Sequence, residues 1–239
     1  MTEEKQEPQK IDFKLPSVEE LVGAGAHFGH RTSRWNPKMK PYIFGVRHAV
    51  HIIDADKSLA KLEEAVNFIS EIASKGGTIL FVGTKPTVKK IIQEGAQNCG
   101  MPYVIGRWLG GTLTNFKTIG KRIEYFRNLE TQIAQDELQK YTKKERLAFQ
   151  KELESLKTNL EGIKNLTRLP EAIFVADIKE DNLVVREARR VGISVVGICD
   201  TNTDPTLVDY PIPANDDASS SVRIILDAIV GAIKQAKEI

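Results

Sequence analysis

Cationic and aromatic side chains alternate along the segment Ala26–Gly45, which reads AHFGHRTSRWNPKMKPYIFG. The segment contains four Lys or Arg residues, four Phe, Trp or Tyr residues and no acidic residue. Lysine and arginine neutralise nucleic-acid phosphates, and aromatic or guanidinium planes stack on bases that a single strand or loop exposes. Pro37 and Pro41 interrupt any long helix, so we expect an irregular backbone here. The pattern favours an RNA-binding surface over its alternative, a solvated basic loop.

A second segment of the same character is Gly106–Asn115, which reads GRWLGGTLTN. Arg107 next to Trp108 pairs a guanidinium with an aromatic plane, and the adjacent glycines let the backbone approach another chain closely. Short hydrogen-bonding side chains follow at Thr112, Thr114 and Asn115. The alternative is a glycine turn that leaves a strand and places Trp108 in the core. The residues alone leave both interpretations open.

The charge of the chain is unevenly distributed. Its 239 residues carry 34 Lys and Arg against 32 Asp and Glu, so the net charge is only +2. That total argues weakly against a nucleic-acid binder, but residues 27–53 carry five cationic side chains and residues 95–123 carry four, with no acid in either range. The sequence therefore predicts two basic surfaces within a nearly neutral protein.

Paired aspartates after an apolar run offer an enzymatic alternative. Asp54 and Asp56 follow Val50–Ile53, as the carboxylates of a magnesium-dependent phosphatase would. Further acids at the ends of expected strands could complete such a site: Asp177, Asp200, Asp204, Asp216 and Asp217. Helix capping and turn formation explain each of these residues equally simply, and we take capping as the default.

Glycine patterns do not complete a nucleotide site. The run from Gly23 to Gly29 has Phe28 where the dinucleotide fingerprint needs its third glycine. The turn Gly83–Lys85 lacks the full spacing of a phosphate loop. It leaves Lys85 as a cation at the start of a helix, where a phosphate could reach it.

The histidines and cysteines do not predict a metal centre or a nucleophile. The histidines form two H-x-x-H pairs, at His27/His30 and His48/His51, but structural zinc nearly always recruits cysteine and none is near. RNA contact or ordinary hydrogen bonding is the favoured interpretation. The two cysteines, Cys99 and Cys199, both stand in apolar surroundings, which predicts no disulfide and a reducing cytosol.

Apolar runs and helical periodicity alternate along most of the chain, which predicts an α/β fold. Ser17 and Glu20 form a capping box for a short helix. Strands are expected at 50–53, 78–82, 102–105, 172–176, 193–198 and, as a short edge strand, 210–212; helices are expected at 59–73, 86–98, 182–191 and 218–236. Strands joined by helices predict a mainly parallel sheet sandwiched by helices, with the strand at 50–53 among its members.

Two regions depart from this rhythm. Residues 1–14 are acidic and polar, so we expect a disordered tail rather than a signal peptide, and no run is long enough to span a membrane. Residues 118–166 are highly charged and carry thin apolar stripes spaced by three and four, which predicts an α-helical coiled-coil hairpin that breaks around 136–144. The globular α/β domain then comprises residues 15–117 and 167–239, and we expect a cytoplasmic protein.

Together the motifs resemble one family. HFGHRTSRWNPKMKPYIFG, HIID, FVGTK, GRWLGGTLTN, DTNTDP and IPANDDA are similar, in order and spacing, to bacterial-type ribosomal small-subunit protein two, as are TKKE at 142–145 and LEGIKNLTRLP. The resemblance runs from about Ser17 to Lys237. It implies a flavodoxin-like domain with an inserted coiled-coil hairpin, and a non-enzymatic constituent of the small ribosomal subunit without cofactor, metal or small-molecule substrate.

The resemblance also implies partners and contact residues. The family binds ribosomal RNA where the head of the subunit meets its body, contacts neighbouring ribosomal proteins, and helps to dock ribosomal protein one in organisms that have it. Motif match assigns RNA contact to His30, Arg31, Arg34, Trp35, Asn36, Lys38, Lys40, Arg107, Trp108, Thr112, Asn115 and Lys117; charge alone adds Arg47 and Lys85. The modest net charge implies that part of the affinity comes from the assembled particle.

Overall fold

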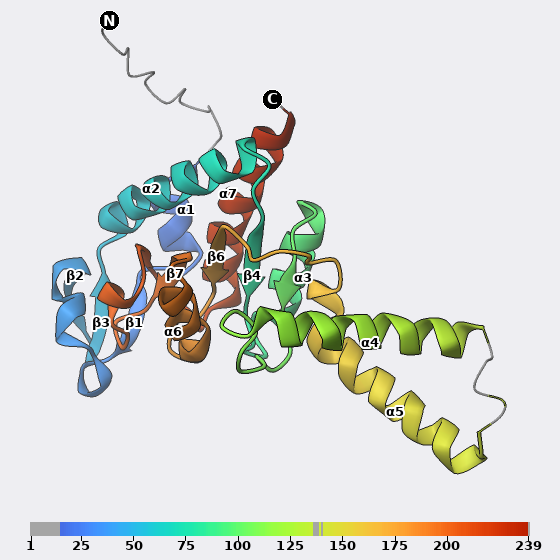
Figure 1. Ribbon diagram of the computed structural model, residues 1–239. Coiled ribbons are helices and arrows are strands. Elements are labelled where there is room, and N and C mark those ends of the chain that lie inside the picture. The colour runs from blue at the N-terminus through green and yellow to red at the C-terminus, as the bar shows by residue number, and fades with distance from the viewer. Residues whose placement is uncertain (1–14, 136–138, 140, 239) are drawn as a thin grey trace, which may run out of the picture.

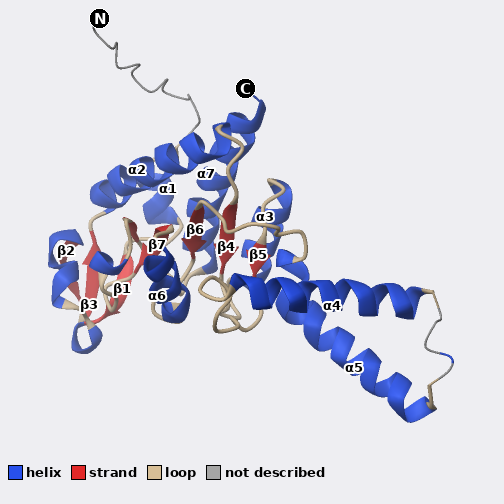
Figure 2. Ribbon diagram, viewed as in Figure 1, coloured by secondary structure: helices blue, strands red, loops and turns tan. Residues whose placement is uncertain are grey.

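The computed structural model describes residues 15–135, 139 and 141–238. The tail predicted for residues 1–14 and part of the predicted break at 136–144 lie outside this range. The described chain forms two sheets of three and five strands with helices around them (Figures 1 and 2). Within it, none of the helices combines the length and the apolar character needed to cross a lipid bilayer.

The larger sheet is parallel throughout, as predicted. Its strands are β4 (Ile79–Val82), β5 (Tyr103–Val104), β6 (Ala172–Val175), β7 (Ser194–Cys199) and β8 (Tyr210–Pro213), in the order β5-β4-β6-β7-β8. Counted from β4, this order is 2-1-3-4-5, the flavodoxin-like arrangement. Its switch point lies between β4 and β6, where the chain passes from one side of β4 to the other.

Helices cover both faces of this sheet, which explains why its strands are apolar runs. Successive strand residues point to opposite faces. Ile79 and Phe81 pack in one core with α2 (Ala55–Ser74), α3 (Lys89–Asn98) and α7 (Ser219–Glu238). Leu80 and Val82 pack in a second core with α6 (Asn182–Val191) and the inner ends of α4 (Phe116–Ala134) and α5 (Lys143–Leu160).

The smaller sheet corrects one prediction. The strand at 50–53 is β3 (Val50–Ile53), but it belongs to an antiparallel sheet with β1 (Phe28–Arg31) and β2 (Ile43–Arg47), in the order β1-β3-β2, and not to the parallel sheet. The reason is local. His48 and Ala49 adopt positive φ angles of 49° and 59°, the two-residue turn that joins antiparallel strands.

Apart from the small sheet, the described N-terminal region up to β3 forms short helices. The predicted capping box is confirmed, since Ser17 accepts from the Glu20 N–H at the start of α1 (Val18–Gly23) and Glu20 caps back. Two 3-10 helices, η1 (Thr32–Arg34) and η2 (Pro37–Tyr42), connect β1 to β2. Pro37 begins η2 and Pro41 lies inside it, where it donates no backbone hydrogen bond, so no long helix forms, as the sequence indicated.

Helices α4 and α5 project from the body of the molecule (Figure 1). Near the body their apolar stripes are buried through Ile123, Phe126 and Leu156, and Glu152 of α5 accepts hydrogen bonds from Arg122 and Tyr125 of α4. Farther out, Leu147 is exposed. A regular coiled-coil seam along the whole pair therefore stays a prediction, and so does the division into residues 15–117, 118–166 and 167–239.

A close backbone contact ties α5 to the parallel sheet. Gly162 lies in the 3-10 helix η4 (Glu161–Ile163) that follows α5, and a Cβ there would collide with the backbone oxygen and the ring of Tyr103 in β5. We expect Gly162→Ala to lower the free energy of unfolding by about 1–3 kcal/mol, because the backbone cannot move aside. Urea unfolding followed by circular dichroism measures this.

Gly231 provides the matched control, because it lies inside α7 with no atom within 4 Å of an added Cβ. Gly231→Ala should leave stability unchanged or raise it by up to about 1 kcal/mol, since alanine favours a helix. Equal effects of the two substitutions would show that the contact at Tyr103 does not constrain the structure.

Candidate nucleic-acid interface

The predicted segment Ala26–Gly45, extended here to Arg47, builds β1, η1, η2 and β2, and its cations point outward. Arg31, Arg34, Lys38, Lys40 and Arg47 are all exposed. Trp35 is also exposed, and its ring lies 5.1 Å from the buried imidazole of His51. His51 therefore packs against the inner side of the Trp35 ring, and Trp35 remains exposed to solvent.

The segment is anchored to the parallel sheet by the loop that follows β7. Thr201 accepts the His30 N–H at its hydroxyl and the Asn36 N–H at its carbonyl, each at 2.7 Å. Gly29 permits this approach, because a Cβ there would collide with the Thr201 side chain. Met39 is completely buried against the second core. These contacts hold the cations in place although the segment contains little regular structure.

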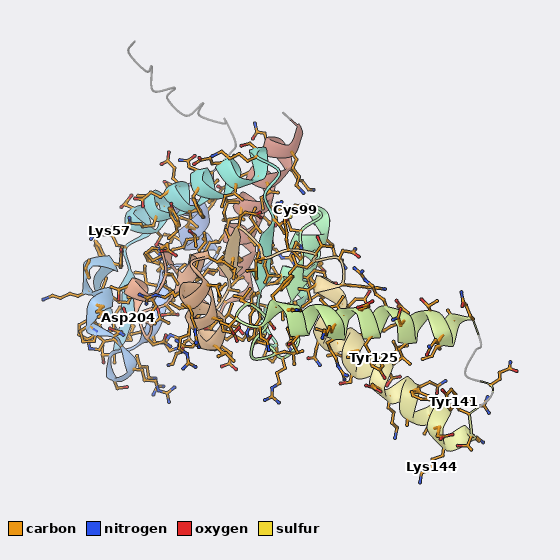
Figure 3. All side chains as sticks on the ribbon, viewed as in Figure 1. Lys57, Cys99, Tyr125, Tyr141, Lys144 and Asp204 are labelled. Carbon is orange, nitrogen blue, oxygen red and sulfur yellow. The ribbon has the colours of Figure 1, made fainter. Side chains whose placement is uncertain are left out.

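Two hollows adjoin these cations. One, of about 430 Å³, is polar and is lined by Arg31, Ser33 and Arg34 with Asp217 at its side. The other, of about 730 Å³, is lined by prolines and by Lys38, Lys40 and Lys57. Lys38 also pairs with Asp204 at 2.7 Å (Figure 3 labels Asp204 beside the small sheet). Guanidinium and ammonium groups around an open hollow suit a phosphate.

The second predicted segment is divided between surface and core. Arg107, Asn115 and Lys117 are exposed, whereas Trp108 is 7% exposed and Thr112 is 2% exposed. The Thr112 hydroxyl donates to the Leu109 carbonyl at 2.6 Å. Trp108 thus lies in the core, as the alternative interpretation described, and any RNA contact of its own stays a prediction.

Glu187 of α6 holds this loop and was not predicted from the sequence. Its carboxylate accepts hydrogen bonds from the backbone N–H groups of Gly111, Leu113 and Thr114 and from the Trp108 indole. Burial acts to raise the pKa of Glu187, but these hydrogen bonds outweigh it and lower that pKa overall. The only acid of a helix rich in arginine, next to the apolar position Ala188, was the sequence signal that could have identified it.

We expect Glu187→Gln to destabilise the protein by about 1–3 kcal/mol, because glutamine leaves some of these backbone N–H groups without an acceptor. A lowered native pKa supplies stability above about pH 4.5, the usual Glu value, that is lost as the pH falls through the native pKa. The deficit of the variant should therefore shrink under acid conditions.

Thermal unfolding between about pH 3 and pH 7 measures this difference, and Trp108 fluorescence in a Trp35→Phe background reports the loop directly. Glu154→Gln, at an exposed position of α5, is the control. A deficit that stayed constant with pH would contradict the role of the charge.

At the carboxyl ends of the parallel strands an acidic cluster surrounds Lys85. Its Nζ lies 3.1 Å from Asp177, 3.0 Å from Asp216 and 2.6 Å from Asp217. His30 joins the cluster through Asp200 and Asp217, at 3.1 and 3.5 Å. Lys85, predicted to meet RNA, is thus enclosed by three carboxylates and only 20% exposed at its side chain.

Within this cluster the cationic side chains and the carboxylates neutralise one another's charge. Burial and the neighbouring charges of Asp177 and Asp200 raise the pKa of Asp216 to about 7. The hydrogen bond from Lys85 lowers the pKa of Asp217, and the hydrogen bond to Asp200 raises the pKa of His30. Burial acts to lower the pKa of Lys85, but Asp217 and Asp216 raise it overall, so this lysine stays charged.

The enzymatic alternative is not assembled here. Asp54 caps α2, accepting from the Lys57 N–H, and takes no part in the cluster around Lys85. Asp204 caps the short helix η5 (Pro205–Leu207). Among the residues that the structure describes, no group of three or more His, Cys, Asp or Glu side chains could hold a metal ion. Cys99 and Cys199 are free buried thiols.

We expect Lys85→Met to destabilise the protein by about 3–5 kcal/mol near pH 7, because it leaves enclosed carboxylates unpaired. Asp216, whose pKa is raised to about 7, takes up a proton between pH 8 and pH 5 and then no longer needs a cation beside it. The deficit should therefore be larger near pH 8 than near pH 5. Chemical denaturation at both pH values tests this.

Lys75→Met is the matched control, because Lys75 pairs with Glu71 on the exposed side of α2. Such a surface pair contributes less than about 1 kcal/mol. A Lys85 variant as stable as the Lys75 variant would mean that the cluster contributes nothing to the fold.

The fold and the site together define a class of protein: a flavodoxin-like α/β domain whose ligand edge is filled by its own lysine and whose cations face outward from loops and short helices. Comparison with known proteins identifies the family. The family model described as Ribosomal protein S2 matches residues 21–236. The chain is also 50% identical over 227 residues to the small ribosomal subunit protein uS2 of Fusobacterium nucleatum subsp. nucleatum, covering 95% of this chain and 92% of that protein.

The chain belongs to the ribosomal protein S2 family. It is a structural, non-enzymatic protein of the small ribosomal subunit, a particle that is cytoplasmic in bacteria and takes part in translation. Ribosomal RNA and neighbouring ribosomal proteins are the partners that this membership implies. The resemblance noted from the sequence motifs is therefore confirmed.

Proposed function

We propose that the chain binds small-subunit ribosomal RNA through the exposed side chains of segment 26–47 and loop 106–117. The observation that carries the proposal is the set of exposed cations on an acid-free segment, held rigidly against Thr201. The exposed contact residues are Arg31, Arg34, Trp35, Lys38, Lys40, Arg47, Arg107, Asn115 and Lys117, and the half-buried His30 and Asn36 complete the proposed set. Trp108, Thr112 and Lys85 act by positioning these segments.

The cationic and the aromatic side chains of segment 26–47 contact different parts of the RNA. Arg31 and Arg34, at the polar hollow, engage phosphates in the bidentate manner of guanidinium groups. Trp35 offers one exposed face to an unstacked base. Such a surface favours a loop or bulge of RNA over a regular helix, whose bases are already stacked.

Helices α4 and α5 extend the same interface away from the body. Lys143, Lys144 and Arg146 are exposed at the outer end of α5, where Figure 3 labels Lys144. We propose that the pair packs as a coiled coil along its apolar stripes and reaches RNA beyond the α/β domain, near the junction of head and body.

Protein docking is a second part of the proposal, carried by the exposed apolar side chains of β2 within the same segment. Phe44 is 80% exposed and Val46 is 56% exposed, and both lie on β2, an edge strand of the small sheet. Exposed apolar side chains on an edge strand are typical of protein interfaces. We propose that a neighbouring ribosomal protein covers them, and that ribosomal protein one docks here in organisms that have it.

Sedimentation tests the proposed function directly. Tagged full-length protein in lysate should sediment with the small subunit in a sucrose gradient at moderate salt, and ribonuclease treatment should release it. A free peak at the top of the gradient without ribonuclease would exclude a stable place in the particle. A magnesium-dependent phosphatase assay would then follow.

Arg34→Ala and Arg107→Ala should each weaken entry into the subunit about tenfold in competition with the unmodified protein, because each removes a charged hydrogen-bonding contact to phosphate. Quantitative mass spectrometry of gradient fractions gives the ratio. Both side chains are exposed, so thermal stability should not change.

Arg223→Ala is the control, because Arg223 lies on α7 and is paired with Glu94 at 3.2 Å. It should enter the subunit like the unmodified protein. If the Arg34 and Arg107 variants do so too, these residue assignments are wrong.

A further inference from the structure

The outer face of α6 carries three arginines. Arg186, Arg189 and Arg190 are exposed, and their spacing of three and four residues places them on one side of the helix. The only acid within α6, Glu187, is turned inward to the loop at 108–114. The outer face is therefore cationic without an acidic residue of the same helix among its exposed side chains.

These arginines differ in their pairing from two other helix arginines, Arg122 of α4 and Arg223 of α7. Arg122 and Arg223 each form an ion pair with a glutamate, at 3.2 Å in both cases. Within the described part of the chain, Arg186, Arg189 and Arg190 form no ion pair with a carboxylate. Three unneutralised guanidinium groups on one rigid helix repel one another, and a bound anion removes that repulsion.

The arginine face continues into the loop already described. Glu187 binds the backbone of Gly111 and Leu113, and Leu183 of α6 would contact a side chain at Gly110. Figure 1 shows α6 beside the loop that leads into α4. The loop that carries Arg107 is thus bound to the helix that carries Arg186. The cations of the loop and those of α6 are therefore held in a fixed position relative to one another.

We propose that the outer face of α6 is a further RNA-binding surface, which takes the phosphate backbone of a structured RNA helix. The inference rests on the proposed function and adds a surface that none of the sequence motifs indicated. Leu183 is the only large apolar residue exposed on α6, and no aromatic side chain lies there to stack on a base. Recognition here is therefore of charge and shape rather than of unstacked bases.

A purely structural role for these arginines makes a different prediction. Arg189 and Arg190 lie in the last turn of α6, where cations stabilise the negative end of the helix dipole. Arg186 lies one turn earlier and is not explained in this way. Substitution of Arg186 should therefore weaken RNA binding without lowering the stability of the helix.

The test uses the full-length double variant Arg186→Gln/Arg190→Gln, in which glutamine keeps the helix propensity while removing the charge. In competition with the unmodified protein, its entry into the small subunit should fall about tenfold or more. Its binding to deproteinised small-subunit ribosomal RNA should lose about two from the slope of log affinity against log salt, one for each phosphate contact.

Two controls accompany the test. Arg168→Gln/Arg223→Gln removes the same charge from arginines that already pair with Glu171 and Glu94, and it should behave like the unmodified protein. Thermal unfolding checks the fold of every variant. If the double variant is unstable, Arg186→Gln alone decides the question, with an expected slope change of about one.

The outcomes distinguish this inference from the proposed function. If the unmodified protein enters the subunit and the α6 variant enters it equally well, the α6 surface is overturned and the proposed function stands. Reduced entry with an unchanged salt slope on RNA also overturns it, since the arginines would then face a protein. Failure of the unmodified protein to sediment with the subunit overturns the proposed function itself.

Discussion

The ion pairs of Lys85 are the interaction on which the arrangement of the site depends. Lys85 follows β4 and Asp177 follows β6, so their contact spans the switch point of the sheet, where flavodoxin-like folds hold a ligand. Asp216 and Asp217 bring the end of β8 to the same ammonium group. The chain fills its own ligand edge with a cation, and the RNA-binding surfaces that we propose lie on segments outside the sheet.

Several buried or half-buried acids hold the basic segments of the protein in place. Glu187 fastens the loop at 108–114, and Asp200 and Asp204 contact His30 and Lys38 from beneath the basic segment. These three acids therefore position basic segments from within the protein. This arrangement explains how a chain with a net charge of only +2 presents two cationic surfaces.

The sequence predicted the parallel sheet because strands covered on both faces are continuous apolar runs, as at Ile79–Val82. It missed β1 and β2, since Phe44 and Val46 are exposed and leave no buried pattern. It assigned Val50–Ile53 to the wrong sheet because four apolar residues specify a strand and not its partner. Glu187 was missed because its role depends on a loop more than seventy residues away.

The motif GRWLGGTLTN shows what geometry adds to a resemblance. Motif match treats its residues alike, but Trp108 and Thr112 are buried and shape the loop, whereas Arg107 and Asn115 face solvent. Only exposed groups can neutralise a phosphate, so we assign the proposed RNA contacts of this loop to the cations at its edge. The same argument extends the surface to α6, whose arginines belong to no motif yet are fixed to this loop through Glu187. Segment 26–47 joins cations to aromatic rings and α6 carries cations alone, so the two surfaces suit unpaired and paired RNA respectively.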